Sequence, residues 1–480
     1  MIQRIDYLGR LAKLRDKRPV KAVSGVRCCG RTTLLAQFID WLKRSGVEDT
    51  QIVYISLEDP ESESLLNYRE LYGYIKKRLC KDKFTYIFID EIQKCANCEK
   101  TIEGIMVNQQ VDFYITVSEA GFFSRVPYIE IRMLPLSFAE YLAFSKAKIL
   151  GGTDKLREFS TAIPGNLVNV PQKVNPVKSE RRLPRQRTQM EKFLQTEAFN
   201  EYLSFGGFPF TAALGGDAAL IRHYIEGVYN TILVKDAARK TGINDIPLLE
   251  TIARMMSRSA GRPLSSKKIS TAIGAKGRKI STNTVETYMQ ALTGACIFYH
   301  IGRYDIKSGK CLKTLGKYYL ADTGIENLLL KESPDIDSRL ENVVCLELLR
   351  RGLQVYVGKY GGDEINFVVF GQQTVQNAAT HGDLAASRLG VNRPAENEGG
   401  KTAYFQVAAS VRDPIVLAGK LSPLERIRDN HPKYVLSLDE TPFRASHNGI
   451  IQRNLIEWLL ETFAHNHIGR FTNVGSNPAT

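Results

Sequence analysis

Long apolar runs are missing from this 480-residue sequence. None approaches the ~18 consecutive apolar residues that a membrane-spanning helix needs. Residues 1–18 are charged throughout and contain no apolar core of the kind found in a signal peptide. These two absences predict a cytoplasmic protein without membrane contact.

Cysteine is also scarce, with eight residues scattered along the chain. This number fits a reducing compartment and argues against a disulfide framework. Cys95 and Cys98 form a lone C-x-x-C pair, but a zinc site needs two further ligands, and no second Cys or His pair stands at a suitable spacing. We therefore expect Cys95 and Cys98 to be two small residues in a loop.

Acidic residues are fewer than basic ones, 51 against 65, which gives a net charge of +14. Such an excess favours polyanionic partners, either nucleic acid or nucleotide phosphates. Apolar residues make up 43% of the chain, which is enough for several packed cores and excludes wholesale disorder. At about 150 residues per domain, the length predicts two to four domains.

The first part of the chain alternates apolar strands with amphipathic helices. Strands are expected at 20–23, 52–57, 86–89, 113–117 and 128–133, and helices at 32–43 and 71–79. Near-continuous apolar strands separated by helices predict a parallel sheet covered on both faces. Right-handed crossovers would place the carboxyl ends of the strands at one edge, where ligands bind.

The strongest chemical signal lies between the first strand and the first helix. The sequence there is Gly25-Val26-Arg27-Cys28-Cys29-Gly30-Arg31-Thr32, followed by Thr33, and its pattern is that of a phosphate-binding loop. The glycines let backbone N–H groups wrap a phosphate, and the helix N-terminus adds positive potential. We expect these nine residues to bind ATP, with the Thr32 hydroxyl as a ligand of Mg²⁺.

One position of this loop departs from the pattern, because Arg31 stands where lysine is usual. A guanidinium keeps the positive charge but is wider and planar, so it places that charge differently between the β- and γ-phosphates. Binding of ATP is expected to survive this change, whereas positioning of the transition state should suffer.

A second signal is the apolar strand 86–89, which ends in Asp90 and Glu91. Asp90 would hold Mg²⁺ together with Thr32, and Glu91 would activate or orient the attacking water. Strand ends are often acidic, so the pair alone is a weak signal. About 60 residues after a phosphate loop it becomes a moderately strong indication of a catalytic ATP–Mg²⁺ site.

These segments carry a family resemblance. Residues 25–35, Asp90-Glu91-Ile92-Gln93 and Leu134-Pro135-Leu136-Ser137-Phe138 resemble prokaryotic AAA-type ATPases, whose C-terminal half is a domain of unknown function. The resemblance covers most of the chain. It implies an α/β P-loop domain with a parallel sheet, then a helical and winged-helix region, then a C-terminal α/β domain similar to restriction endonucleases.

The expected divisions follow from this resemblance and from changes in composition. Residues 173–192 contain seven basic and two acidic side chains, which indicate a solvated basic linker or insertion. We expect an AAA-type domain at 1–145, the linker at 146–196, a helical and winged-helix region at 197–335, the nuclease-like domain at 336–465 with an insertion at 372–401, and a tail at 466–480.

Three departures from the family mark a degenerate member with impaired hydrolysis. The first is Arg31. The second is Glu119, which ends the segment Thr116-Val117-Ser118-Glu119 where the family has Asn, and a carboxylate there would repel phosphate unless it is protonated or turned away. The third is Pro127, which stands where the family has an arginine.

Residues 263–304 are typical of a winged helix, with helices expected at 265–273 and 282–292 and a hairpin that turns at residues 308–309. In a basic protein, this unit could bind DNA phosphates. Many winged helices only pack against neighbouring domains, so both roles stay open. The side chains that would contact phosphates are Lys267, Lys268, Lys276, Arg278 and Lys279.

The C-terminal domain offers a second candidate site at Glu341, Asn366 and Gln406. A nuclease of the implied fold has Asp at the position of Asn366, and the lysine expected two residues after Gln406 is Ala408. Neutral Asn is a poorer ligand for Mg²⁺ than Asp. Glu364 could substitute for the missing Asp, but it lies two residues before the expected position. These residues predict a nuclease fold without nuclease activity, used for binding or packing.

Three hypotheses follow. The first is an AAA-type protein that binds ATP and Mg²⁺ and hydrolyses ATP weakly or not at all, and that could form oligomers. The second is a scaffold without nucleotide affinity, in which the loop is a relic. The third is a DNA-binding protein that acts through the winged helix and an inactive nuclease-like domain.

Overall fold

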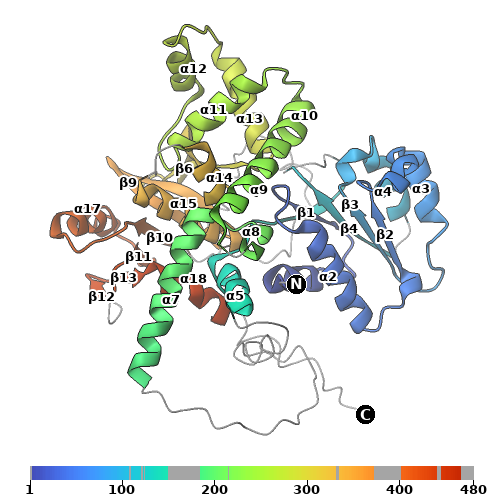
Figure 1. Cartoon of the computed structure of the whole chain (residues 1–480), viewed down its shortest axis with the longest axis horizontal. Helices are drawn as coiled ribbons and strands as arrows, with labels where there is room; N and C mark the ends of the chain where they lie inside the picture. Colours follow the sequence, from blue (N-terminus) through green and yellow to red (C-terminus); the bar gives the residue numbers. More distant parts are fainter. Residues whose placement is uncertain are drawn as a thin grey trace.

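Figure 1 shows the computed structural model of the chain. It describes residues 3–107, 110–119, 123, 125–149, 184–214, 216–330, 335–371, 402–440 and 445–465. Within these ranges, no helix has both the length and the apolar character needed to cross a membrane. The expected insertion 372–401, the tail 466–480 and the linker residues 150–183 lie outside the described residues.

A five-stranded sheet forms the core of the N-terminal domain, on the right of Figure 1. Its order is β2-β3-β4-β1-β5, and all its pairings are parallel, as the sequence predicts. Since β1 lies between β4 and β5, its carboxyl end is a topological switch point, where ligands bind in open α/β sheets. The strands are β1 Val20–Ser24, β2 Ile52–Ser56, β3 Thr85–Asp90, β4 Val111–Val117 and β5 Tyr128–Arg132.

Helices cover both faces of this sheet because the side chains of its strands alternate between two cores. Phe88 packs with Phe38 of α2 on one face, whereas Ile87 and Ile89 join the core beneath α3 and α4 on the other. The helical elements of the domain are α1 Ile5–Lys13, α2 Arg31–Arg44, η1 Asp49–Gln51, η2 Pro60–Leu66, α3 Tyr68–Lys76, η3 Ile92–Lys94 and α4 Cys98–Met106.

A mostly helical region follows, as expected. Its helix α7 begins at Pro184, so residues 184–196 are helical and do not form the linker that their charge predicts. Proline suits the first turn of a helix, and Phe199 and Tyr202 anchor the other end of α7 against Phe138. The elements are α5 Phe138–Ile149, α7 Pro184–Phe205, α8 Pro209–Ala213, α9 Ala218–Thr231, the π-helical η4 Ile232–Ala238, α10 Arg239–Thr241, α11 Ile246–Arg258, α12 Ser266–Gly274 and α13 Thr282–Gly294.

The two helices expected in the winged helix are α12 and α13, and an antiparallel hairpin of β6 Phe298–Asp305 and β7 Lys310–Leu320 follows them. Strand β6 also pairs in parallel with β8. The hairpin is therefore an edge of the C-terminal sheet as well as a neighbour of α13, and the winged-helix assignment stays a prediction.

The C-terminal sheet has eight strands in the order β12-β13-β11-β10-β9-β8-β6-β7. Helices α5, α7, α15 and α18 share a core with one face, and α17 packs on the other. The remaining strands are β8 Gln354–Tyr360, β9 Asp363–Phe370, β10 Thr402–Val407, β11 Lys433–Ser437, β12 Ala445–His447 and β13 Ile450–Asn454. The helices are α14 Thr323–Leu329, α15 Ile336–Arg350, α17 Pro414–Glu425 and α18 Leu455–His465. Similarity to restriction endonucleases stays a prediction.

Candidate functional site

The loop of residues 25–33, called the phosphate loop below, leaves the carboxyl end of β1 and enters α2. Gly25 is required there, because a Cβ atom would lie 2.2 Å from the carbonyl oxygen of Met133. Gly30 has a φ of +103° and Cys28 a φ of +64°, so the loop turns through left-handed conformations before the helix begins. This is the strand–loop–helix context that a phosphate-binding loop requires.

Arg4, from the segment before α1, holds the phosphate loop from behind. Its guanidinium donates to the carbonyl oxygens of Cys29, at 3.1 Å, and Leu134, at 2.8 Å, and forms an ion pair of 2.8 Å with Glu140. Arg4 and Glu140 are both buried. No sequence pattern pointed to this role of Arg4, because its partners lie far apart along the chain.

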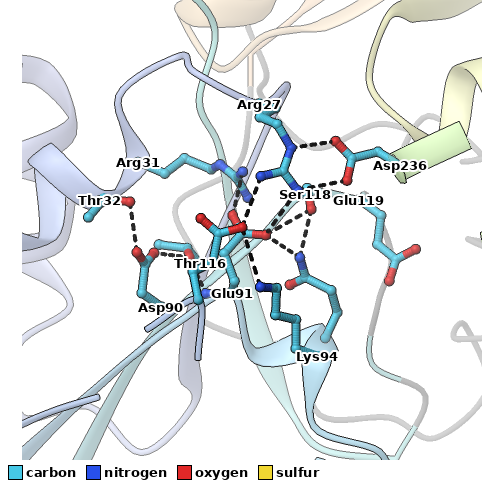
Figure 2. A network of polar contacts seen from close by, with 12 residues as sticks. Arg27, Arg31, Thr32, Asp90, Glu91, Lys94, Thr116, Ser118, Glu119 and Asp236 are labelled. Carbon is cyan, nitrogen blue, oxygen red and sulfur yellow. Dashed lines mark hydrogen bonds and ion pairs between the residues drawn. The ribbon is translucent and has the colours of Figure 1, made fainter. Parts of the chain in front are cut away.

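Thr32 and Asp90 meet directly behind the phosphate loop. The hydroxyl of Thr32 donates to Asp90 Oδ2 at 2.7 Å, and the hydroxyl of Thr116 donates to the other oxygen of Asp90 (Figure 2). Burial raises the pKa of Asp90, and the two hydroxyl donors counteract part of that rise. Two oxygen groups predicted to hold Mg²⁺ are thus side by side, although one is on α2 and the other at the end of β3.

Arg31 is paired with Glu91. The distance between Arg31 NH2 and Glu91 Oε1 is 2.6 Å, and both side chains are about 5% exposed. Arg31 NH1 is buried and has no hydrogen-bond partner among the described residues. The carboxylate that we predicted to orient water therefore holds the cation of the phosphate loop.

Glu91 has three further side-chain partners, of which Arg27 is the most distant, with its NH2 group 3.9 Å from Glu91 Oε2. Ser118 donates to Glu91 Oε2 at 3.0 Å (Figure 2). The amide of Gln93 donates to the same oxygen and, at 2.6 Å, to Ser118. Ser118 and Gln93 each lie in a segment that resembles the family, but no sequence pattern predicted their contacts with Glu91. The structure shows that both restrain Glu91.

Arg27 connects the phosphate loop to the helical region. Its Nε and NH2 groups donate to the two oxygens of Asp236 at 2.9 and 3.0 Å, and NH1 donates to Glu58 at 3.0 Å. Asp236 is buried and belongs to the π-helical turn η4. The hydrogen bonds to Asp236 raise the pKa of Arg27. No sequence pattern pointed to Asp236, which lies 209 positions from Arg27.

Glu119 does not face this cluster. It forms an ion pair of 3.3 Å with Lys240 of α10, and Figure 2 shows its carboxylate directed away from Glu91. The repulsion between Glu119 and a bound phosphate, one of the outcomes considered from the sequence, is therefore reduced by the orientation of the side chain.

The comparisons with known proteins agree with this geometry. Residues 17–142 match a family described as AAA domain, and residues 196–335 match a family described as a domain of unknown function. The N-terminal part of the chain is thus similar to AAA domains. This match supports an ATP-binding protein of the AAA type.

Two relatives extend over most of the chain. An uncharacterised protein of Haemophilus influenzae is 28% identical over 377 residues, which cover 77% of this chain and 84% of the relative. An uncharacterised protein of Methanocaldococcus jannaschii is 24% identical over 371 residues, with coverage of 74% and 72%. Among solved structures, a Walker-type ATPase of Pyrococcus abyssi matches with 13% identity and a TM-score of 0.38, covering 68% of this chain and 96% of that one.

The residues predicted for the C-terminal site also come together. Glu341 accepts hydrogen bonds from the amide of Asn366, at 2.6 Å, and from Tyr319, at 2.5 Å. Gln406 accepts from the backbone N–H of Asn366 at 3.3 Å. Ala408, where a lysine was expected, is a buried core residue.

A lysine that the sequence analysis did not name occupies the centre of this cluster. Lys317 of β7 is 3% exposed and contacts Glu341 at 3.0 Å and Glu364 at 2.7 Å. Burial alone would lower the pKa of Lys317, but the two carboxylates raise it above its ordinary value. The ammonium group of Lys317 therefore neutralises part of the negative charge of Glu341 and Glu364, as a bound metal ion would.

Cys95 and Cys98 are both buried, and Cys98 begins α4 instead of lying in a loop. Burial raises the pKa of Cys95 to about 11 and that of Cys98 to about 12, so both are thiols at neutral pH. Among the described residues, no group of three or more His, Cys, Asp and Glu side chains is arranged to hold a metal ion.

Proposed function

We propose that the protein binds ATP with Mg²⁺ at residues 25–33 and that it hydrolyses ATP weakly or not at all. The observation that carries this proposal is the 2.7 Å hydrogen bond between the Thr32 hydroxyl and Asp90 behind the phosphate loop. Hydroxyl and carboxylate oxygens are the ligands that Mg²⁺ prefers, and these two groups converge on one point. The fit rests on these side chains and on the loop that precedes them.

Thr32 and Asp90 would hold Mg²⁺, and the ion would neutralise part of the phosphate charge. Backbone N–H groups of the phosphate loop would surround the β-phosphate, while the N-terminus of α2 adds positive potential. The γ-phosphate would attract the guanidinium of Arg31 and compete with Glu91 for it. Glu91, once released, is the group that would orient water.

The ion pair between Arg31 and Glu91 is also the reason that we expect impaired hydrolysis. Catalysis of phosphoryl transfer depends mainly on positioning and on charge stabilisation. Arg31 has a broad planar head that Glu91 holds at 2.6 Å, and Glu91 can orient water only when it gives up this contact. Each of the two groups therefore restrains the other.

A scaffold without nucleotide affinity is the alternative that a specific observation favours. Both arginines of the phosphate loop already have carboxylate partners, Arg31 in Glu91 and Arg27 in Asp236. If these ion pairs are too stable for ATP phosphates to displace, the loop does not bind nucleotide and is a relic. The two functions differ in one measurable quantity, the affinity for ATP.

Titration of the full-length protein with ATP, with and without Mg²⁺, tests the proposal. We expect binding in the micromolar range that weakens when Mg²⁺ is omitted.

Steady-state turnover of Arg31→Lys, measured beside the wild type, tests the proposal that hydrolysis is impaired. A lysine places a compact ammonium group at this position instead of a broad planar guanidinium, so we expect turnover to rise at least about tenfold. Equal turnover in the two proteins would contradict our explanation of the damaged loop.

A further inference from the structure

The segment that contains α12 and α13 is strongly basic. Between residues 258 and 294 there are seven basic side chains and one acidic one, Glu286. Figure 1 shows α12 at the top edge of the molecule, away from the N-terminal sheet. A concentration of positive charge on a projecting unit is an electrostatic footprint for a polyanion.

The two helices form a compact helix-turn-helix unit. Ile269 and Ile273 of α12 are buried with Val285 and Met289 of α13 in one core. Between the helices, Gly277 adopts a φ of +88° and allows a tight turn. The hydroxyl of α12 residue Ser270 donates to the carbonyl oxygen of Ile280 at 2.8 Å, which fixes the second helix relative to the first.

The outer face of α13 is polar and exposed. Asn283, Thr287 and Gln290 follow one another at spacings of four and three residues, so they lie on one face of the helix, and all three are exposed. Amide side chains form bidentate hydrogen bonds with adenine in the major groove, and threonine contacts base edges there as well. The thirteen residues of α13 span about 20 Å, and an α-helix fits the major groove of B-DNA.

Exposed lysines flank this face. Lys267 and Lys268 lie in the first turn of α12, and Lys276 and Lys279 lie in the turn before α13. In helix-turn-helix proteins, the first helix crosses the sugar-phosphate backbone while the second enters the groove. Arg278, which the sequence analysis grouped with these lysines, instead forms an ion pair with Asp245 and ties the turn to the start of α11.

We propose that this unit binds duplex DNA, with α13 in the major groove and Lys267, Lys268, Lys276 and Lys279 on the flanking phosphates. Duplex RNA does not fit the same arrangement, because its major groove is deep and narrow. The inference uses no residue of the ATP site and stands whether or not ATP binds.

Fluorescence anisotropy with the full-length protein tests the proposal. The probe is a 30-base-pair DNA duplex of random sequence, without nucleotide, at 50, 100 and 200 mM NaCl. The double variant Lys276→Ala/Lys279→Ala should lose at least about tenfold in affinity at 100 mM, and the slope of log K against log salt should fall by about 1.8. The matched control is Lys77→Ala/Lys81→Ala, which removes two exposed lysines of the N-terminal domain and should leave affinity unchanged.

Three results would overturn the proposal. These are no binding at 50 mM NaCl, an equal loss of affinity in the control variant, or equal affinity for duplex RNA of the same sequence.

A selection from the random DNA pool tests the contact between α13 and the major groove separately. Asn283→Ala/Gln290→Ala should alter the selected sequences while total affinity for the pool changes by less than about threefold. Unchanged sequences would show that α13 does not lie in the groove.

Discussion

Two clusters of carboxylates in this chain each hold a cation that the chain itself supplies. At the phosphate loop, Arg31 meets one carboxylate, Glu91, and keeps a buried NH1 group without a hydrogen-bond partner among the described residues. In the C-terminal sheet, Lys317 meets two carboxylates, Glu341 and Glu364, at 3.0 and 2.7 Å. The residue types are similar, but the number of bonds to the cation differs.

The difference shows why one pair can exchange its partner and the other cannot. In the proposed function, the N–H group of Arg31 that lacks a partner among the described residues is one that a bound phosphate would satisfy once the pair with Glu91 opens. Lys317 divides its charge between two carboxylates within a sheet, so both contacts must break before the ammonium group can pair with another ion. The proposed function therefore requires an exchangeable pair of Arg31 and Glu91, whereas Lys317 and its two carboxylates form a structural cluster.

The largest expected effect comes from removing the structural cation. Lys317→Met leaves the carboxylate of Glu341 buried without its counter-ion, and breaking a buried pair in this way typically costs about 3–5 kcal/mol. We expect the free energy of unfolding in urea to fall by that amount. Lys310→Met, at an exposed position of the same strand, is the control and should change it by less than about 0.5 kcal/mol.

Adding Glu341→Gln to Lys317→Met should restore part of the lost stability, because the unpaired charge is then removed as well. If Lys317→Met lowers the free energy of unfolding by less than about 1 kcal/mol, Lys317 is not the structural counter-ion that the comparison requires.

Asp322 gives a third case, a buried carboxylate that accepts only backbone N–H groups, from Gly207 at 2.6 Å and Gly324 at 2.8 Å. Burial raises its pKa from 3.8 to about 7 despite these donors. Between about pH 4 and 7, the folded state therefore keeps a proton that the unfolded chain has lost. Stability should fall as pH rises through this range, by up to about 1.4 kcal/mol per pH unit.

Asp322→Asn removes this titration but loses one of the two backbone hydrogen bonds, because an amide has a single oxygen and Gly207 and Gly324 donate to different oxygens of Asp322. That loss lowers stability at every pH and leaves the slope to report the titration. Urea denaturation at pH 5, 6 and 7 should show a flatter dependence of stability on pH in the variant than in the wild type. Glu326, whose pKa is also raised to about 7, contributes the same slope to both proteins. Parallel pH profiles would contradict the uncompensated burial of Asp322.

The smallest expected effect concerns the exchangeable pair. Glu91→Gln removes the charge that competes with phosphate for Arg31, so ATP should bind up to about tenfold more tightly, a gain of about 1.4 kcal/mol. Any residual turnover should disappear, because the carboxylate that orients water is lost. Glu58→Gln removes a more exposed carboxylate that contacts Arg27 and should change the affinity less. Weaker binding by Glu91→Gln would contradict the competition between Glu91 and phosphate.

Local sequence patterns predicted the N-terminal sheet well. The apolar run 86–89 forms a buried strand, and the glycines of residues 25–30 signal a loop through their backbone requirements. The parallel pairing and the contact between Thr32 and Asp90 follow from this local information, since parallel strands end at one edge.

The remaining features depend on contacts between distant segments. Arg31 was expected to contact a phosphate, but in the structure it forms an ion pair with Glu91. The fold brings these two residues together, and no local sequence pattern predicts the contact. No sequence pattern predicted the ion pairs of Lys317 and Asp236, because their partners come from distant elements of the fold. The helix α7 extends into a segment whose charge predicts a linker, since packing of Phe199 and Tyr202 at its far end outweighs the composition of its start.

The most direct test of the exchangeable site is calorimetric titration of the wild type and Asp90→Ala with ATP in the presence of Mg²⁺. Our account predicts micromolar binding by the wild type and loss of binding in Asp90→Ala, because that carboxylate positions Mg²⁺ with Thr32. Absence of binding by the wild type would contradict it, and would show that the pair of Arg31 and Glu91 is as fixed as that of Lys317 and its two carboxylates.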